Sequence, residues 1–261
     1  MKKCALLFMV ALCTLSAANA TAFESSIEIS YGVLPIKNIE SQLDACRILV
    51  QELTHSNEKV INQLDVFAQT LKRAYLSGEG FIHKDIYNII DAIIFSTGKH
   101  RFQTRKDPDQ TPYIIHPIGV ANILMTTGKI RDPDIIIGAL LHDTLEDTQT
   151  TFEEIEQRFG IRAANFIREV TDDKSLPKET RKHLQVEHAP EKSAGAAQIK
   201  LADKLYNLSD LTKAPPRDWE IERIDAYFQW AQSVVNRLPW VNAPLKQAVD
   251  KVIQAYEADN K

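Results

Sequence analysis

Apolar residues recur every three or four positions along most of the chain, which is the spacing of one face of an α-helix. The first such pattern runs over residues 39–53 and the second over residues 60–75. Asn57, or the serine before it, is suited to cap the second helix, and the Ser-Gly-Glu-Gly run at 77–80 is expected to stop it. Residues 21–80 therefore predict an N-terminal helical segment that packs on the remainder of the protein.

From residue 81 to residue 261 the pattern is helical throughout, without βαβ alternation. The expected helices cover residues 86–103, the segment from His116-Pro117 to Gly128, and residues 134–147, 194–211, 218–238 and 242 to the C-terminus. Asp132-Pro133 is expected to begin the helix at 134–147, which is apolar nearly all round and so belongs at the centre of a bundle. A capping box of Thr150 and Glu153 is expected to begin a further helix, which Gly160 ends. The predicted fold is all-α, with residues 81–261 as one domain.

Composition agrees with a folded helical protein and excludes some partners. Of 261 residues, 44% are hydrophobic and only 9 are glycine, which argues against disorder and against a turn-rich β architecture. Lysine and arginine number 31 against 35 acidic residues, so the formal charge is −4. A nucleic-acid-coating surface is therefore not expected, and any phosphate must be held by a few placed cations.

The N-terminus has the layout of a cleavable signal peptide. Residues 1–3 are Met-Lys-Lys, residues 4–15 form an apolar run, and Ala18-Asn19-Ala20 is a cleavage pattern. Cleavage would follow Ala20 and give a secreted or periplasmic enzyme; without cleavage the enzyme would be cytoplasmic. The run is too short to span a bilayer, and no later apolar run is long enough, so no membrane span is expected.

Four ionisable residues lie at the end of the predicted central helix, in the word Leu-His-Asp-Thr-Leu-Glu-Asp at 141–147. Such groups are costly to desolvate unless they are paired. In a continuous helix His142 and Glu146 share one face, as do Asp143 and Asp147. An adjacent His-Asp pair is suited to bind a metal ion, and the two acids then face what the metal holds.

Two more residues are candidate partners of this pair. His116 precedes Pro117, and Asp203 lies in the word Lys-Leu-Ala-Asp-Lys-Leu-Tyr-Asn-Leu at 200–208. A histidine in this setting is also commonly a structural residue. Spacing alone does not bring either residue to the His-Asp pair, so both interpretations stay open at this point.

The order of these words resembles that of a known family. His116, His142-Asp143 and Asp203 resemble the H…HD…D pattern of HD-domain metal hydrolases. The surrounding words at 111–117, 139–148, 170–174 and 200–208 are similar to the hydrolase domain of the RelA/SpoT-homologue family, and most of all to its small stand-alone metazoan members. The similarity runs from about Asn88 to about Leu238. It implies an HD-domain helical bundle without the synthetase domain of longer members.

The resemblance also implies a reaction. Its metal ligands would be four residues, namely His116, His142, Asp143 and Asp203. The usual ion is Mn²⁺, which suits two imidazoles and two carboxylates. Glu146 and Asp147 match the family residues that activate and orient the attacking water. The implied activity is hydrolytic removal of the 3′-pyrophosphate from the guanosine alarmones ppGpp and pppGpp of the stringent response.

Six further residues match family contacts to the nucleotide, namely Arg105, Lys106, Lys178, Asn207, Arg223 and Tyr227. By that match, Arg105 and Lys106 hold the guanine and phosphate side, and Lys178 holds a phosphate. Arg223 and Tyr227 are expected at the rim of the pocket. For Lys178 and Arg223 an ordinary exposed surface charge stays an alternative.

Three other functions stay open. The first is the same chemistry on the 2′-phosphate of NADPH. The second is another HD-type activity, a nucleotide phosphohydrolase or a cyclic-nucleotide phosphodiesterase, against which the intact words around Arg105 and Asn207 argue. The third is a non-catalytic binding module, which the complete set of candidate ligands and acids disfavours. The sequence does not indicate the oligomeric state.

Overall fold

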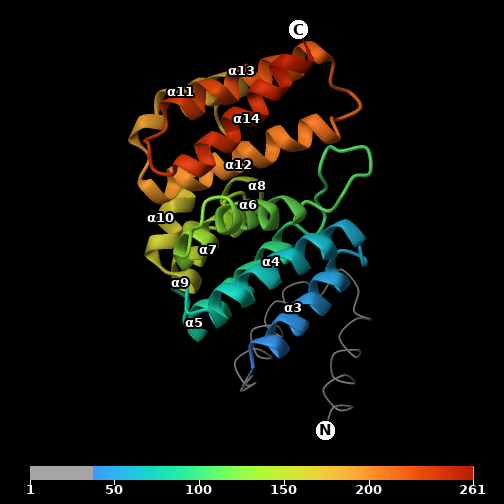
Figure 1. The fold of residues 1–261 in the computed structure, drawn as a ribbon, viewed down its shortest axis with the longest axis vertical. Coiled ribbons are helices and arrows are strands. Elements are labelled where there is room, and N and C mark those ends of the chain that lie inside the picture. Colours follow the sequence, from blue (N-terminus) through green and yellow to red (C-terminus); the bar gives the residue numbers. More distant parts are fainter. Residues whose placement is uncertain (1–37, 261) are drawn as a thin grey trace. The chain divides into compact units, whose positions relative to one another are not determined.

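The computed structural model describes residues 38–260, and those from 39 to 260 belong to one compact unit. The expectation of an all-α protein is confirmed, because the described residues form helices and connecting turns with one isolated β-bridge between Thr104 and Pro112. In chain order the helices are α3 (Ile39–Leu53), α4 (Glu58–Leu76), α5 (His83–Lys99), α6 (Ile115–Thr126), α7 (Pro133–Leu141), α8 (Thr144–Asp147), α9 (Phe152–Phe159), α10 (Ile161–Val170), α11 (Lys178–Glu187), the 3₁₀ turn η2 (Ala189–Glu191), α12 (Ala194–Lys213), α13 (Ile221–Arg237) and α14 (Ala243–Asp259) (Figure 1).

The first two helices pack on the same unit as the rest. Asn57 caps α4, its side chain accepting the N–H of Val60, and α4 ends at Leu76 just before the predicted stop. Helix α3 contacts α5, and α4 contacts α6 along its length (Figure 1). Residues 39–76 thus lie against the helices that precede and carry the candidate site.

Helix α7 is the centre of the unit, as its apolar sequence predicts. Every residue from Ile135 to Leu141 is buried, and α7 contacts α5, α6, α10 and α12. Asp132 caps it by accepting the N–H of Asp134, and Pro133 occupies its first turn. Helix α12 lies between α6 and α14 (Figure 1) and also contacts α7. The helix that carries Asp203 therefore packs against the helix that carries His116 and against the helix that ends just before His142.

The predicted helix over 134–147 is wrong in one respect that matters for the site: α7 ends at Leu141, and α8 begins at Thr144. The ring Nδ1–H of His142 donates to the Ala139 carbonyl at 2.8 Å, and the Thr144 hydroxyl donates to the Leu141 carbonyl at 2.7 Å. Side-chain donors therefore take carbonyls that a continuing helix would offer to its own backbone. The two acids of the word consequently stand on a separate short turn.

Other boundaries differ by a few residues. Thr151 rather than Thr150 caps α9, accepting the N–H of Glu154, while the Thr150 hydroxyl pairs with Thr148. Helix α6 begins at Ile115, so Pro117 lies inside its first turn. A proline is tolerated there because the backbone N–H that it lacks would have no partner within the helix. Helix α11 was not expected, because it buries no residue and so shows no apolar stripe.

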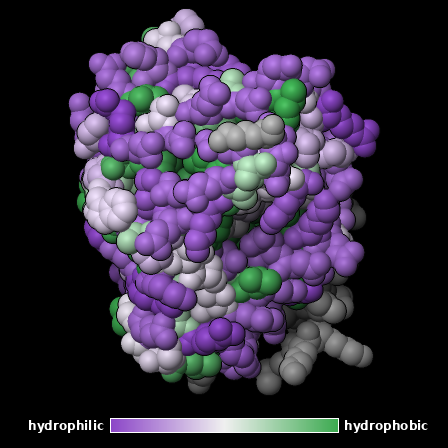
Figure 2. Space-filling model, turned by 45° about the horizontal axis from the view of Figure 1, so that its top comes forward, coloured by the Kyte–Doolittle hydropathy of each residue, from purple (hydrophilic) through white to green (hydrophobic). Residues whose placement is uncertain are grey.

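The described surface is largely hydrophilic. In the view of Figure 2, hydrophobic residues appear as small scattered groups among hydrophilic ones. The most exposed large hydrophobic side chains are Phe102 and Trp240, which come from separate loops. Within residues 38–260 no helix combines the length and apolar content that crossing a bilayer requires.

Candidate active site

Three elements far apart in the sequence bring the four candidate ligands together. His116 comes from the first turn of α6, His142 and Asp143 from the turn between α7 and α8, and Asp203 from the middle of α12. The Nε2 atoms of His116 and His142 are 3.2 Å apart, and Asp143 Oδ2 lies 3.5 Å and 3.1 Å from them. Asp203 Oδ1 lies 3.3 Å from His116 Nε2 and 3.9 Å from His142 Nε2.

This spacing fits a metal centre. Nitrogen and oxygen ligands at about 2.0–2.2 Å from an ion lie about 3–3.5 Å from one another. The Ala139 carbonyl holds the proton on Nδ1 of His142, so that its Nε2 can present a lone pair to the shared point. His116, His142 and Asp143 each offer an atom within 4.8 Å of the others. Two imidazoles and two carboxylates are a suitable donor set for a divalent transition-metal ion.

The charges of the cluster also demand a cation. Burial lowers the pKa of His142, but the adjacent Asp143 carboxylate outweighs burial and raises that pKa to about 9. Burial, followed by the positive charge of Arg105, lowers the pKa of His116 to about 4. The neighbouring carboxylates therefore favour positive charge at this point of the cluster, which a metal ion held by the four residues would supply.

Hydrogen bonds fix the two carboxylates of the cluster. The Tyr113 hydroxyl donates to Asp143 Oδ2 at 2.6 Å. Lys204 Nζ lies 3.1 Å from Asp203 Oδ2, and Asn207 donates to Asp203 Oδ1 at 2.6 Å. These partners orient the carboxylates toward the histidines, which is the ordinary role of groups behind metal ligands.

The two candidate catalytic acids lie on α8, beside the cluster in sequence but with partners of their own. Glu146 Oε2 accepts the backbone N–H of Asp172 at 3.0 Å, and Glu146 Oε1 lies 3.3 Å from Lys174 Nζ. Lys174 also donates to Asp147 Oδ1 at 2.5 Å. Burial raises the pKa of Glu146 above its usual range. A half-buried carboxylate of raised pKa is a suitable proton acceptor near neutral pH.

Asp147 lines a cavity of about 400 Å³, and Glu146 is not among its lining residues. Its lining includes cationic, aromatic and acidic residues, among them Arg105, Lys106, Asp107, Tyr113, Asp147, Lys174, Asn207, Asp210, Trp219 and Tyr227. Arg105 donates to Asn207 Oδ1 at 2.8 Å and to Asp210 Oδ2 at 2.9 Å. Its guanidinium lies 5.7 Å from the ring centres of both Tyr113 and Tyr206, which is within cation–π range.

The predicted nucleotide contacts divide into two groups. Arg105, Lys106, Asn207 and Tyr227 line the cavity. Lys178 and Arg223 do not. The Arg223 guanidinium is 4.2 Å from the ring centre of Trp219, a lining residue, so Arg223 lies near the edge of the cavity. Lys178 is an exposed residue at the start of α11. Partial burial and then the positive charges of Lys182 and Arg223 lower its pKa.

Several residues that the structure brings to the site are not among those expected from the sequence. Tyr113 and Lys174 are in the quoted family words, so their position in those words was the available signal. Asp210 and Trp219 line the cavity without any such signal. The Trp219 indole Nε1 is buried without a hydrogen-bond partner among the described residues, so one donor at this wall is available to a ligand.

Comparison with known families places this geometry in context. The sequence profile described as "HD domain" matches residues 92–227, about half of the chain, and this range holds all four residues of the cluster and both acids. The chain belongs to the HD-domain family. Within the family, the predicted similarity to metazoan SpoT homologues is confirmed by individual relatives.

The HD domain is 54% identical over 162 residues to a protein of Xenopus tropicalis named "Guanosine-3′,5′-bis(diphosphate) 3′-pyrophosphohydrolase MESH1", covering 62% of this chain and 90% of that one. The Homo sapiens protein of that name is 52% identical over 161 residues, covering 62% and 90%. A solved structure titled "A metazoan ortholog of SpoT hydrolyzes ppGpp and plays a role in starvation responses" matches with a TM-score of 0.63 at 45% identity. It covers 65% of this chain and 95% of that chain.

The expectation of a secreted or periplasmic enzyme is wrong. The homologues of this HD domain are MESH1/SpoT-like cytosolic enzymes. A basic start followed by an apolar run is a compositional pattern, and it holds no information about where a substrate is found. Residues 1–20, on which that expectation depended, lie outside the described residues.

Proposed function

We propose that this protein is a metal-dependent hydrolase that removes the 3′-pyrophosphate from ppGpp and pppGpp. The single observation that carries the proposal is the convergence of four residues, His116, His142, Asp143 and Asp203, at histidine–histidine and histidine–carboxylate distances of 3.1–3.9 Å. Their hydrogen-bond partners Tyr113 and Asn207 line the cavity of about 400 Å³. Relatives that share about half of their residues with it are named for that reaction. Hydrolysis of a phosphate ester is what such a cluster with adjacent acids is suited to do.

The metal ion would be held by His116, His142, Asp143 and Asp203, and Mn²⁺ is the ion we propose. When bound, the metal polarises a phosphate oxygen and lowers the pKa of water. The supporting observation is the mixed nitrogen and oxygen donor set, in which each carboxylate has a second hydrogen-bond partner that orients it.

Glu146 is the proposed general base. Burial raises its pKa, and the Asp172 N–H holds one of its oxygens, leaving the carboxylate fixed in place beside the cluster. Glu146 takes a proton of the attacking water as the new phosphorus–oxygen bond forms and the bond between phosphorus and the ribose 3′ oxygen breaks. The 3′ oxygen leaves with the bonding electron pair and takes up a proton to become the 3′-hydroxyl of the nucleotide product. Asp147, paired with Lys174, is proposed to orient the same water.

The substrate is proposed to enter the cavity with its base toward Arg105. A guanidinium beside two tyrosine rings offers a flat cationic surface, on which a base can stack or a phosphate can fork. Lys106 and Lys178 would hold phosphates, and Asn207, Arg223 and Tyr227 would close the pocket around the ribose and its 3′-diphosphate.

The 2′-phosphate of NADPH is the second candidate substrate. The cations Lys178 and Arg223 are mutually repelling, so any phosphate on the ribose would relieve them. A 2′-phosphate and a 3′-diphosphate both meet that requirement. We rank ppGpp first because the MESH1 relatives are named for it.

Residues 81–261 are proposed to form the hydrolase domain. The segment before it is proposed to support that domain rather than to bind substrate. Helix α4 contacts α6, which carries His116, and none of the residues of α3 or α4 lines the 400 Å³ cavity.

A substrate panel tests the proposal. The protein loaded with Mn²⁺ is incubated with ppGpp, pppGpp, NADPH, cyclic nucleotides and common nucleoside triphosphates, and both phosphate and pyrophosphate release are measured. The expected result is the highest kcat/KM for ppGpp and pppGpp, with loss of turnover in Glu146→Gln. A higher kcat/KM for NADPH than for ppGpp would make NADPH the preferred substrate. If the protein turned over none of these compounds, the proposed hydrolytic function would be wrong.

A further inference from the structure

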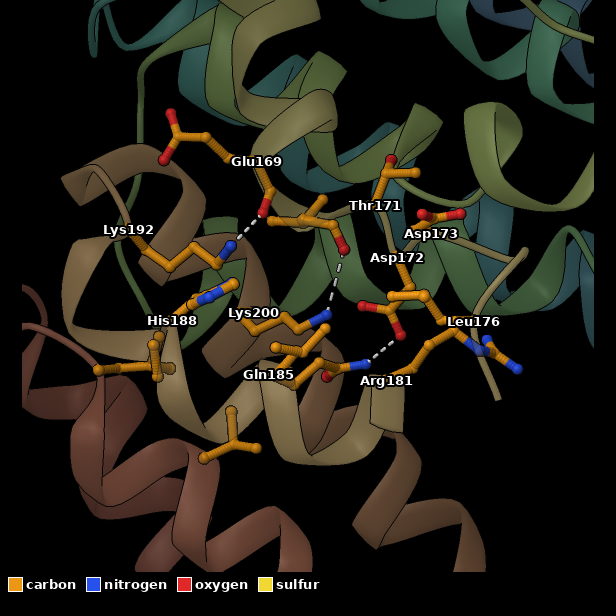
Figure 3. A pocket seen from close by; sticks show the side chains of 15 residues that line it. Glu169, Thr171, Asp172, Asp173, Leu176, Arg181, Gln185, His188, Lys192 and Lys200 are labelled. Atoms are coloured by element: carbon orange, nitrogen blue, oxygen red, sulfur yellow. Dashed lines mark hydrogen bonds between the residues drawn. The ribbon is translucent and has the colours of Figure 1, made fainter. Parts of the chain in front are cut away.

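A buried lysine of α12 lies behind the proposed general base. Lys200 is 8% exposed, and its Nζ donates to the backbone carbonyl of Val170 at 3.2 Å, its one hydrogen-bond acceptor among the described residues (Figure 3). No carboxylate of residues 38–260 forms an ion pair with it, and burial, followed by the positive charge of Lys204, lowers its pKa. Burying an ammonium group on one neutral acceptor is costly, so its retention in the core calls for a reason.

The carbonyl that Lys200 holds is two residues from a contact of Glu146. Val170 ends α10, and the next segment runs to Asp172, whose N–H donates to Glu146 Oε2 at 3.0 Å. From the other side, Gln185 of α11 donates to Asp172 Oδ2 at 2.6 Å (Figure 3). The segment 170–172 is thus fixed at its start by Lys200 and at its end by Gln185, and its backbone presents one N–H to Glu146.

Helix α12 also carries the neighbouring site residues. Lys200, Asp203 and Asn207 are spaced by three and four positions, so they share one face of the helix. Asp203 belongs to the candidate metal cluster, while Lys200 holds the segment that contacts Glu146. One rigid helix therefore sets the position of the metal cluster and of the general base together.

We infer that Lys200 is a positioning residue for the proposed general base: it fixes the 170–172 backbone so that the Asp172 N–H orients the Glu146 carboxylate. The inference rests on the proposed function, since Glu146 must act as a base for its orientation to matter. Lys200 touches no part of the cavity lined by Arg105 and Asn207, so it is not expected to bind the nucleotide.

Lys192 offers a control, because it holds the carbonyl of the residue just before Val170. Lys192 donates to the backbone carbonyl of Glu169, so the two lysines hold adjacent carbonyls at the same end of α10 (Figure 3). Both also line the same cavity of about 230 Å³, which shares no lining residue with the cavity of about 400 Å³. Glu169 lies one residue farther from Asp172, and its side chain is tied to the Ser193 N–H instead. Lys192, half-buried where Lys200 is buried, controls for the loss of a lysine that holds a carbonyl at this end of α10.

A double-mutant cycle in the full chain tests the inference. Lys200→Met and Lys192→Met each remove the ammonium group and keep most of the stem, and each is made alone and together with Glu146→Gln. Steady-state kinetics use whichever substrate of the panel the wild-type enzyme turns over fastest. Failure of ppGpp as substrate is thereby separated from failure of the inference.

Lys200→Met is expected to lower kcat at least tenfold, with KM changed less than twofold and bound metal unchanged. In the Glu146→Gln background, Lys200→Met is expected to lower kcat less than twofold. Lys200 acts through the carboxylate of Glu146, and that carboxylate is already absent in this background. Lys192→Met is expected to leave kcat within twofold of wild type. If thermal melts show that Lys200→Met is unfolded, Lys200→Gln takes its place in the cycle. An equal fold-loss in both backgrounds, or an equal loss for Lys192→Met, would overturn the inference.

Discussion

The Nε2 atoms of His116 and His142 lie 3.2 Å apart, although 26 residues separate them in the chain. Two ring nitrogens at this distance cannot both point protons at each other without repulsion, so at least one must present a lone pair. Asp143 Oδ2 and Asp203 Oδ1 approach the same point. The arrangement is that of ligands around a cation.

Removing one of these ligands should therefore remove metal and activity together. For His142→Ala and Asp203→Ala we expect bound metal, measured by elemental analysis after gel filtration, to be lost along with turnover. His183→Ala is the control, since that histidine is exposed on α11 and its one ion pair is with Glu187. Turnover at normal metal content in either cluster variant would contradict the assignment of the metal site.

Glu146→Gln should separate metal binding from catalysis. Glutamine keeps the shape of the side chain and an oxygen for the Asp172 N–H, but it cannot take a proton from water. We expect normal metal content and a fall in kcat of roughly 10²–10⁴, the usual range for loss of a general base. Loss of metal in this variant would make Glu146 a ligand instead.

The pH profile should follow the same residue. Burial raises the pKa of Glu146 above the usual range, and only its deprotonated form accepts a proton. The rate should therefore be full above that raised pKa and fall as pH decreases through it. Measured as kcat against pH at saturating metal, this acidic limb should lie above pH 4.5, the ordinary value for glutamate, and should be absent from the residual activity of Glu146→Gln. A limb that persists in that variant would belong to another group.

Lys178→Ala should affect substrate binding more than turnover. If Lys178 holds a ground-state phosphate at the edge of the cavity, its removal raises KM with little change in kcat. Lys84→Ala, an exposed lysine of α5, is the control and should change neither constant. An unchanged KM for every substrate of the panel would return Lys178 to an ordinary surface charge.

A glycine in α6 should be intolerant of any side chain. A Cβ on Gly119 would lie 2.0 Å from Cε2 of Tyr206, whose ring centre is 4.9 Å from that of His116. Gly119→Ala should lower the free energy of unfolding by about 1–3 kcal/mol through overpacking, and should lower activity by displacing Tyr206. Gly98→Ala is the matched control, because nothing lies within 4 Å of its Cβ and alanine favours a helix. Equal melting temperatures for the two variants would contradict the packing around Tyr206.

The apolar pattern was sufficient for the core and insufficient for the site. The burial of α7 follows from its residues, because a helix that is apolar all round has no face to offer to water. The break after Leu141 did not follow, since it depends on side-chain donors of His142 and Thr144 that compete for carbonyls. The apolar pattern did not predict α11, because none of its residues is buried and it therefore has no apolar face.

The full set of candidate site residues could be predicted only from the sequence motifs that resemble those of the family. Spacing indicated that His142 and Asp143 could bind a metal, but Asp203 is 60 residues beyond Asp143 and reaches it only through the packing of α12 on α6 and α7. Trp219 and Asp210 line the cavity from outside any quoted motif. Such contacts depend on tertiary structure, and no local pattern encodes them.

Product analysis with ppGpp tests the proposed reaction most directly. The Mn²⁺-loaded protein is incubated with ppGpp labelled in its 3′-diphosphate, and the products are separated by anion-exchange chromatography. The proposed function predicts one equivalent of labelled pyrophosphate and one of GDP, with neither formed by Glu146→Gln. Release of single phosphate groups, or no product from a protein with full metal content, would contradict it.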